Sequence, residues 1–192
     1  MAQPTEDSSG IAFDIPQRLE RLPLTSFQKK IFYIIGTAWF FDSMDLGMLT
    51  FVLGSIKTDF HLTTVQAGLL SSSSFLGMFL GAAIAGMAAD RFGRKIVFQY
   101  SMILWGGASI LCALSRNVEQ LAVFRILLGL GMGMEFPIGQ SLVSEFIPAK
   151  NRGRYVALLE GFWPIGFIAA GLLAYFILPI GGWRSAFGSQ RR

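Results

Sequence analysis

The sequence predicts an all-α membrane protein, and its composition and the pattern of its apolar segments support that prediction. Hydrophobic residues make up 53% of the 192 residues and charged residues only 15%, whereas soluble domains carry roughly 25% charge. The mean hydropathy is +0.53. Five apolar segments follow one another along the chain, and each is long enough to cross a bilayer as a helix. Clusters of charged residues separate them, so we expect five transmembrane helices.

The apolar segments define the expected domain organisation. They cover residues 31–56, 66–89, 96–114, 120–147 and 155–180. We therefore expect a transmembrane bundle over 31–182, a cytoplasmic amino-terminal segment over 1–30 and a short tail over 183–192. The first 30 residues are polar and acidic at their start, which argues against a cleaved signal peptide. Within them, Arg18 and Arg21 interrupt a loose apolar pattern of Ile15, Leu19, Leu22 and Leu24, which is typical of a short amphipathic helix on the inner membrane face.

Lysine and arginine in the short connections predict the orientation in the membrane. Basic clusters precede the first apolar segment, join the second to the third, and join the fourth to the fifth; their members are Arg18, Arg21, Lys29, Lys30, Arg91, Arg94, Lys95, Lys150, Arg152 and Arg154. The positive-inside rule places these connections and the amino terminus in the cytoplasm, with the protein in the inner membrane. The basic tail, with Arg184, Arg191 and Arg192, does not fit the rule. Dispersed basic residues without a continuous stripe exclude a nucleic-acid interface.

Small residues and prolines shape the expected helix packing. Gly77 and Gly81 form a pair of small residues four apart, which lets helix backbones approach closely. Further glycines recur in the last two apolar segments, at Gly129, Gly131, Gly133, Gly161, Gly166 and Gly171. Pro137 and Pro164 fall inside the same two segments, where proline removes a backbone hydrogen bond and favours a kink.

Two aspartates lie in the middle of the first apolar segment. Asp42 and Asp45 are three residues apart, so they share one helical face that must look into a bundle or a polar cavity. Arg125 and Glu135 lie inside the fourth segment. Clustered buried acids can exchange protons within an ordinary pH range, which is the chemistry of proton coupling. The alternative is a static hydrogen-bonded pair that fixes helix packing.

Depth along the helices predicts which of these charges can meet. Counted from the cytoplasmic ends, Asp42 and Glu135 lie at a similar depth, whereas Arg125 lies about 12 Å deeper than Asp45. An ion pair between Asp45 and Arg125 therefore requires the first helix to begin earlier or to tilt. Arginine stays ionised when buried, so Arg125 needs an anionic partner, either a carboxylate of another helix or that of a substrate.

The connection after the second segment carries the most specific motif. Residues 86–95 read Gly-Met-Ala-Ala-Asp-Arg-Phe-Gly-Arg-Lys, which resembles the cytoplasmic loop signature of the major facilitator superfamily. Gly86 would permit close helix approach, Asp90 would cap or pair at a helix end, and Gly93 would allow a tight turn, so that the loop, with Arg91 and Arg94, forms a latch. The alternative is a simple positive-inside anchor.

Further stretches extend the resemblance over most of the chain. Residues 125–133 resemble the arginine and glycine signature of the fourth helix of that superfamily, and residues 144–154 resemble the loop after it. Residues 18–25, 41–45 and 159–163 are similar to bacterial niacin and aromatic-acid proton symporters. Members of the superfamily have twelve helices in two halves. The resemblance thus implies a truncated amino-terminal bundle, in which missing carboxy-terminal helices are needed for a full carrier.

The resemblance implies secondary active, proton-coupled symport of a small organic or aromatic acid, with a niacin-like carboxylate as the model substrate. Proton coupling is expected at Asp42, Asp45, Arg125 and Glu135, and substrate contact at Phe41, Gln140, Glu160 and Trp163. The expected partners are a small-molecule substrate, protons and membrane lipid. One cysteine and one histidine offer no metal centre or catalytic triad, so we expect neither cofactor nor enzyme activity. The alternatives are a sugar or polyol carrier of the same fold and a non-transporting membrane fragment.

Overall fold

The computed structural model describes residues 25–186, with side chains placed for residues 25–176. This part of the chain is helical and contains no strand. Its elements are α2 (Ser26–Asp59), α3 (Thr64–Phe92), α4 (Arg94–Leu114), α5 (Val118–Phe146), α6 (Ala149–Glu160) and α7 (Phe162–Ala186). The predicted all-α fold class is confirmed. The predicted helix at residues 18–24 and the residues after 186 lie outside the described part.

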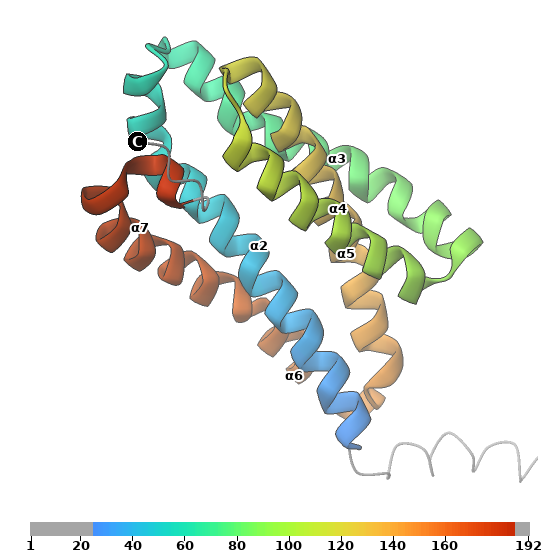
Figure 1. Cartoon of the computed structure of the whole chain (residues 1–192). Coiled ribbons are helices and arrows are strands. Elements are labelled where there is room, and N and C mark those ends of the chain that lie inside the picture. Colours follow the sequence, from blue (N-terminus) through green and yellow to red (C-terminus); the bar gives the residue numbers. More distant parts are fainter. Residues whose placement is uncertain (1–24, 187–192) are drawn as a thin grey trace, which may run out of the picture.

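The helices pack in two groups (Figure 1). In one group α5 packs extensively against both α3 and α4, and in the other α2 packs along α7. Contacts of α2 with α3 and α5 are limited, so a small number of side chains decides how the two groups fit together.

Four parts of the described chain are long and apolar enough to cross a membrane: α3, α4, α5, and the continuous stretch Ala149–Phe176 formed by α6 and most of α7. Helix α2 has 34 residues and is about 51 Å long, but it falls short of the same apolarity because Asp42 and Asp45 lie in its middle. A fifth crossing by α2 therefore stays a prediction from its length and its place in the bundle.

The last predicted span, 155–180, is two helices instead of one. Helix α6 ends at Glu160 and α7 begins at Phe162, with Gly161 between them. The proline ring clashes with the carbonyl group four residues earlier, and Glu160 is four residues before Pro164. The interruption at Gly161, which keeps right-handed helical backbone angles, thus lies one turn before Pro164, where the proline was expected to disturb the helix, and Pro137 lies inside α5 as expected. Helix α7 also continues to Ala186, beyond the predicted boundary at 182.

Glycines bring the backbones of α3 and α5 into direct contact. A Cβ atom built on Gly129 would lie 2.0 Å from the carbonyl oxygen of Ser74, and one on Gly133 would lie 2.1 Å from that of Met78. From the other side, a Cβ atom on Gly77 would lie 2.1 Å from the carbonyl oxygen of Ile126. No side chain fits at these distances, so the predicted close packing of small residues is confirmed for this pair of helices.

Two apolar clusters form most of the core, one toward each end of α2. The first contains Ile35 and Trp39, and the second contains Val52 and Ile56. Asp42 and Asp45 lie between these positions and are buried, so the charged residues occupy the middle of the bundle, where apolar side chains shield them on both sides.

We predict that Gly129→Ala destabilises the bundle while Gly106→Ala does not. The new methyl group at 129 would meet a backbone carbonyl that cannot move without shifting α3, whereas a Cβ atom on Gly106 meets nothing within 4 Å. Overpacking of this kind costs about 1–3 kcal/mol. Thermal unfolding of the purified chain in detergent should show a lower midpoint for Gly129→Ala. Equal midpoints for the two variants would contradict the packing of α3 against α5.

Candidate functional site

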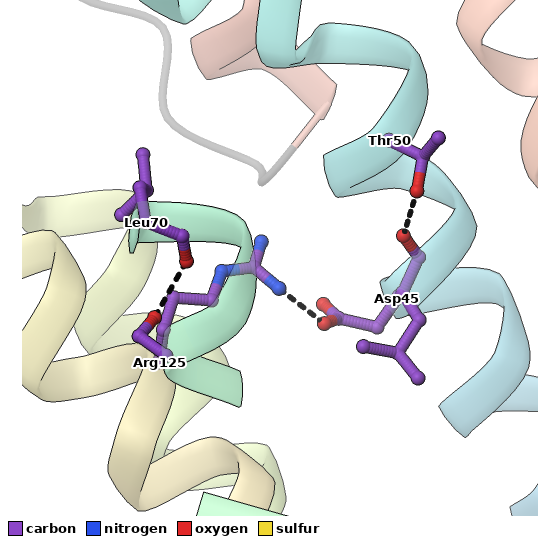
Figure 2. A network of polar contacts seen from close by, with 6 residues as sticks. Asp45, Thr50, Leu70 and Arg125 are labelled. Atoms are coloured by element: carbon purple, nitrogen blue, oxygen red, sulfur yellow. Dashed lines mark hydrogen bonds and ion pairs between the residues drawn. The ribbon is translucent and has the colours of Figure 1, made fainter. Parts of the chain in front are cut away.

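A buried ion pair joins the two helix groups. The Nη1 atom of Arg125 on α5 donates to the Oδ2 atom of Asp45 on α2 at 2.8 Å, and Figure 2 shows the two side chains reaching toward each other across the interface. Arg125 is fully buried and Asp45 is 7% exposed. Thr50 on the next turn of α2 donates its hydroxyl to the carbonyl oxygen of Leu46 and not to the carboxylate of Asp45.

The start of α2 explains why this pair forms. The helix begins at Ser26, five residues before the predicted start, because Thr25 and Gln28 form a capping box. Gln28 also donates its Nε2 amide to the carbonyl oxygen of Phe146 at 2.6 Å, which fastens the start of α2 to the end of α5. Counted from Ser26 and Phe146, Asp45 and Arg125 differ in depth by only about 3 Å. The predicted offset of about 12 Å is therefore wrong, since it used a start that was too late.

Asp42 and Glu135 form a second buried acidic site. Each is 1% exposed, and each has one carboxyl oxygen, Oδ2 of Asp42 and Oε1 of Glu135, without a hydrogen-bond partner among the described residues. Both line the same cavity of about 490 Å³, although counting from Ser26 and Phe146 gives them depths that differ by about 8 Å and not the predicted common depth. The electrostatic neighbours of Asp42 are Glu135 and Asp45, so this side of the site is acidic.

A smaller cavity of about 230 Å³ lies beside the turns of α2 that follow Asp45. Its walls come from α2, α3 and α7, and its lining residues are Leu46, Leu49, Thr50, Ser71, Phe75, Trp163 and Phe167. Three aromatic rings and two hydroxyl groups therefore surround it. Trp163 was among the expected substrate contacts, whereas Phe75 and Phe167 were not, because their positions in long apolar segments carry no sign of a cavity.

The other expected substrate contacts are not brought together. Phe41 lines the larger cavity, whereas Gln140 and Glu160 are exposed and bind each other, with Gln140 Nε2 donating to Glu160 Oε1 at 3.0 Å. Neither of these two lines a described cavity. The described structure does not bring Phe41, Gln140, Glu160 and Trp163 together in one cavity, and their contact with a substrate stays a prediction. Glu160 is the last residue of α6, which the break at Gly161 separates from α7.

The loop signature folds as a compact turn between α3 and α4. Gly93 adopts a φ angle of +85°, a conformation that side chains disfavour, and it ends α3 and begins α4. Arg94 donates to the hydroxyl of Ser141 and forms an ion pair with Glu145, both near the end of α5. The guanidinium of Arg91 lies 5.5 Å from the centre of the Phe92 ring. The loop is thus attached to α5.

Two parts of the predicted latch differ from expectation. A Cβ atom on Gly86 would meet nothing within 4 Å, so the described helices make no close approach there. Asp90 is exposed, and no hydrogen bond or ion pair of its side chain occurs among the described residues. The acidic partner of the loop is Glu145, and its charge, opposite to that of Arg94, is the one sign of this pairing in the sequence. Both Gly86 and Asp90 face away from the described bundle.

The chain is similar to known membrane transporters. The model of the Major Facilitator Superfamily matches residues 35–190. The niacin transporter NiaP of Acinetobacter baylyi is 41% identical over 174 residues, which cover 91% of this chain and 40% of that protein. The 4-hydroxybenzoate transporter PcaK of the same organism is 32% identical over 92% of this chain and 38% of its own length.

Solved structures show the same fold. The inward-open xylose transporter XylE of E. coli superposes with a TM-score of 0.75 at 21% identity, over 83% of this chain and 44% of that one. The chain thus spans about two fifths of the length of the relatives it matches. The family match covers most of the chain and agrees with its helical fold, so the chain belongs to the major facilitator superfamily of membrane transporters.

Proposed function

We propose that the protein containing this chain is a proton-coupled symporter of small aromatic carboxylates. The observation that carries the proposal is the buried pair of Arg125 and Asp45. A charge inside a membrane bundle is costly and is retained mainly where transport or proton movement needs it. The pair also joins helix groups that otherwise make limited contact.

The pair couples a proton to an anion through charge balance. Arg125 stays ionised and cannot be left without an anion in a buried site, because removing one partner of such a pair costs about 3–5 kcal/mol. When Asp45 takes up a proton, it no longer balances Arg125. A substrate carboxylate can then bind the guanidinium, and its departure requires Asp45 to release the proton again. One proton and one carboxylate are thus bound together.

The smaller cavity suits the ring of such a substrate. It follows Asp45 along α2, holds about 230 Å³, and offers Trp163, Phe75 and Phe167 as apolar walls. Aromatic pairs in offset or edge geometry contribute about 0.5–1.5 kcal/mol beyond buried area. The hydroxyl groups of Thr50 and Ser71 provide hydrogen bonds for a ring substituent or nitrogen. Niacin and 4-hydroxybenzoate, named for two of the relatives, are single-ring carboxylates of this kind.

Two other functions fit the fold less well. A sugar or polyol carrier needs several hydrogen-bonding side chains around its substrate, whereas four of the seven residues lining the smaller cavity are Leu or Phe. A membrane component without transport activity would keep the buried ion pair for helix packing alone, at the cost that charges carry inside a membrane. The similarity to the xylose transporter is a similarity of fold.

The basic connections and the apolar helices also suggest where the protein lies and how it is oriented. We infer a multi-pass protein of the inner membrane with its amino terminus in the cytoplasm, in contact with lipid on its exposed apolar side chains. The remaining length of a full carrier would supply the other wall of the transport path. The loop joining α3 to α4 would then lie on the cytoplasmic face.

We predict that Asp45→Asn abolishes proton-driven uptake of nicotinate, by at least about tenfold, in cells that express the complete gene. The amide keeps the shape of the side chain but cannot release a proton, so net symport stops while exchange of external for internal substrate continues. Net symport is measured as uptake of labelled nicotinate with and without a protonophore. Exchange is measured as counterflow of labelled against unlabelled nicotinate. Glu119→Gln, an exposed acid on α5, is the matched control and should retain both. Equal loss of uptake and exchange in Asp45→Asn would assign the residue a structural role.

We predict that substrate competition follows the ring and the carboxylate. Excess benzoate should inhibit nicotinate uptake, because it presents a ring to the smaller cavity and an anion to Arg125. Benzyl alcohol, which lacks the carboxylate, and xylose, which lacks both features, should inhibit little. Stronger inhibition by xylose than by benzoate would favour the sugar or polyol carrier.

We predict that a cysteine at Phe92 reacts only from the cytoplasmic side. Phe92 is 57% exposed and lies at the end of α3, and the basic residues around it favour the inner face. The one native cysteine, Cys112, is buried and is replaced by alanine for the test. A membrane-impermeant maleimide should label inverted vesicles and spare intact cells. Labelling of intact cells would reverse the orientation proposed above.

A further inference from the structure

The larger cavity is built along one face of α2. Its lining residues on that helix are Lys30, Tyr33, Ile34, Thr37, Ala38, Phe41 and Asp42, a spacing of three and four residues that follows one side of a helix. From Lys30 to Asp42 this face is about 18 Å long. Met102 and Trp105 of α4 and Glu135 of α5 form the opposite wall. Arg125 lines neither this cavity nor the smaller one.

The inner end of the cavity is acidic. Asp42 and Glu135 are almost fully buried, and each has a carboxyl oxygen without a hydrogen-bond partner among the described residues. Buried polar atoms of this kind are rare and call for a ligand or another explanation. The one basic residue that lines the cavity is Lys30, about 18 Å away along α2.

Aromatic rings surround the path to these acids. Tyr33, Phe41 and Trp105 line the cavity, and ring faces attract cations by about 0.5–2 kcal/mol, more where water is excluded. The Nε1 atom of Trp105 is buried and also has no acceptor among the described residues. Carboxylates at one end and aromatic walls along the sides are the two features that recognise a positively charged nitrogen on an apolar body.

We propose that this cavity binds a small organic cation, a protonated amine carried on an aromatic body, with its nitrogen at Asp42 and Glu135. The volume of about 490 Å³ lies within the range of small-molecule sites. A metal ion would leave most of this space and its apolar walls unused. The site shares no residue with the smaller cavity and prefers the opposite charge, and Asp45 of the ion pair is an electrostatic neighbour of its Asp42.

Protection from chemical labelling tests the site in the full chain. Cysteine replaces Thr37, an exposed residue of the cavity wall, in a Cys112→Ala background, and the purified chain is placed in lipid nanodiscs. The probe is 2-phenylethylammonium, with 2-phenylethanol as the neutral analogue and phenylacetate as the anion. We expect the ammonium to slow maleimide labelling of the cysteine at Thr37 at concentrations at least about tenfold lower than either analogue. A cysteine at Gly68, which is exposed on α3, should show no protection.

Charge-neutral variants identify the acids involved. In the Glu135→Gln variant, 2-phenylethylammonium should protect the cysteine at position 37 no better than 2-phenylethanol does. In the Glu119→Gln variant, altered on the same helix, the ammonium should still protect it at lower concentrations than the alcohol. Trp105→Phe, which keeps a ring, should also preserve this difference and serves as a folded variant of the cavity wall. Equal protection by all three probes in the unaltered cavity would overturn the proposal and leave an apolar groove. Protection that rises with the number of chains per nanodisc, without any probe, would instead show a second copy covering it.

Discussion

The ion pair between Arg125 and Asp45 is the contact that the rest of the arrangement depends on. It lies where apolar clusters shield it on both sides, and it connects helix groups that touch each other at few other points. Removing either charge leaves the other buried without compensation, which costs far more than the pair contributes. The relative position of α2 and α5 is therefore sensitive to the charge on one carboxyl group, and this sensitivity is what a proton-driven carrier requires.

The two helix groups differ in how firmly they are held. Glycines at Gly77, Gly129 and Gly133 let the backbones of α3 and α5 touch, and packed backbones leave little freedom for rotation. Helix α2 is held to α7 in a similar way at Gly166, where a Cβ atom would lie 2.2 Å from the carbonyl oxygen of Phe40, and by the hydroxyl of Ser43, which donates to the carbonyl oxygen of Trp163. Each group is thus rigid, and adjustment is concentrated between them.

Apolar segment lengths and glycine spacing were sufficient to predict the helical fold, because both are local properties of the sequence. The depth of Asp45 relative to Arg125 was not predictable, since it depends on the capping box at Thr25 that extends α2 beyond its apolar part. The cavities were also beyond prediction: Trp105 and Phe167 look like ordinary membrane residues until neighbouring helices enclose them. The hydrogen bond between Gln140 and Glu160 was not predictable either, since it joins side chains of α5 and α6 that are 20 residues apart in the sequence.

The hydrogen bond from Gln28 to the carbonyl oxygen of Phe146 makes α2 a lever. It holds the first turn of α2 to the last turn of α5, about 26 Å along α2 from Asp45 and about 47 Å from its end at Asp59. A rigid helix pivoting at Gln28 amplifies any separation at the ion pair by the ratio of these lengths. An opening of about 1 Å at Asp45 then becomes about 2 Å at the far end of α2.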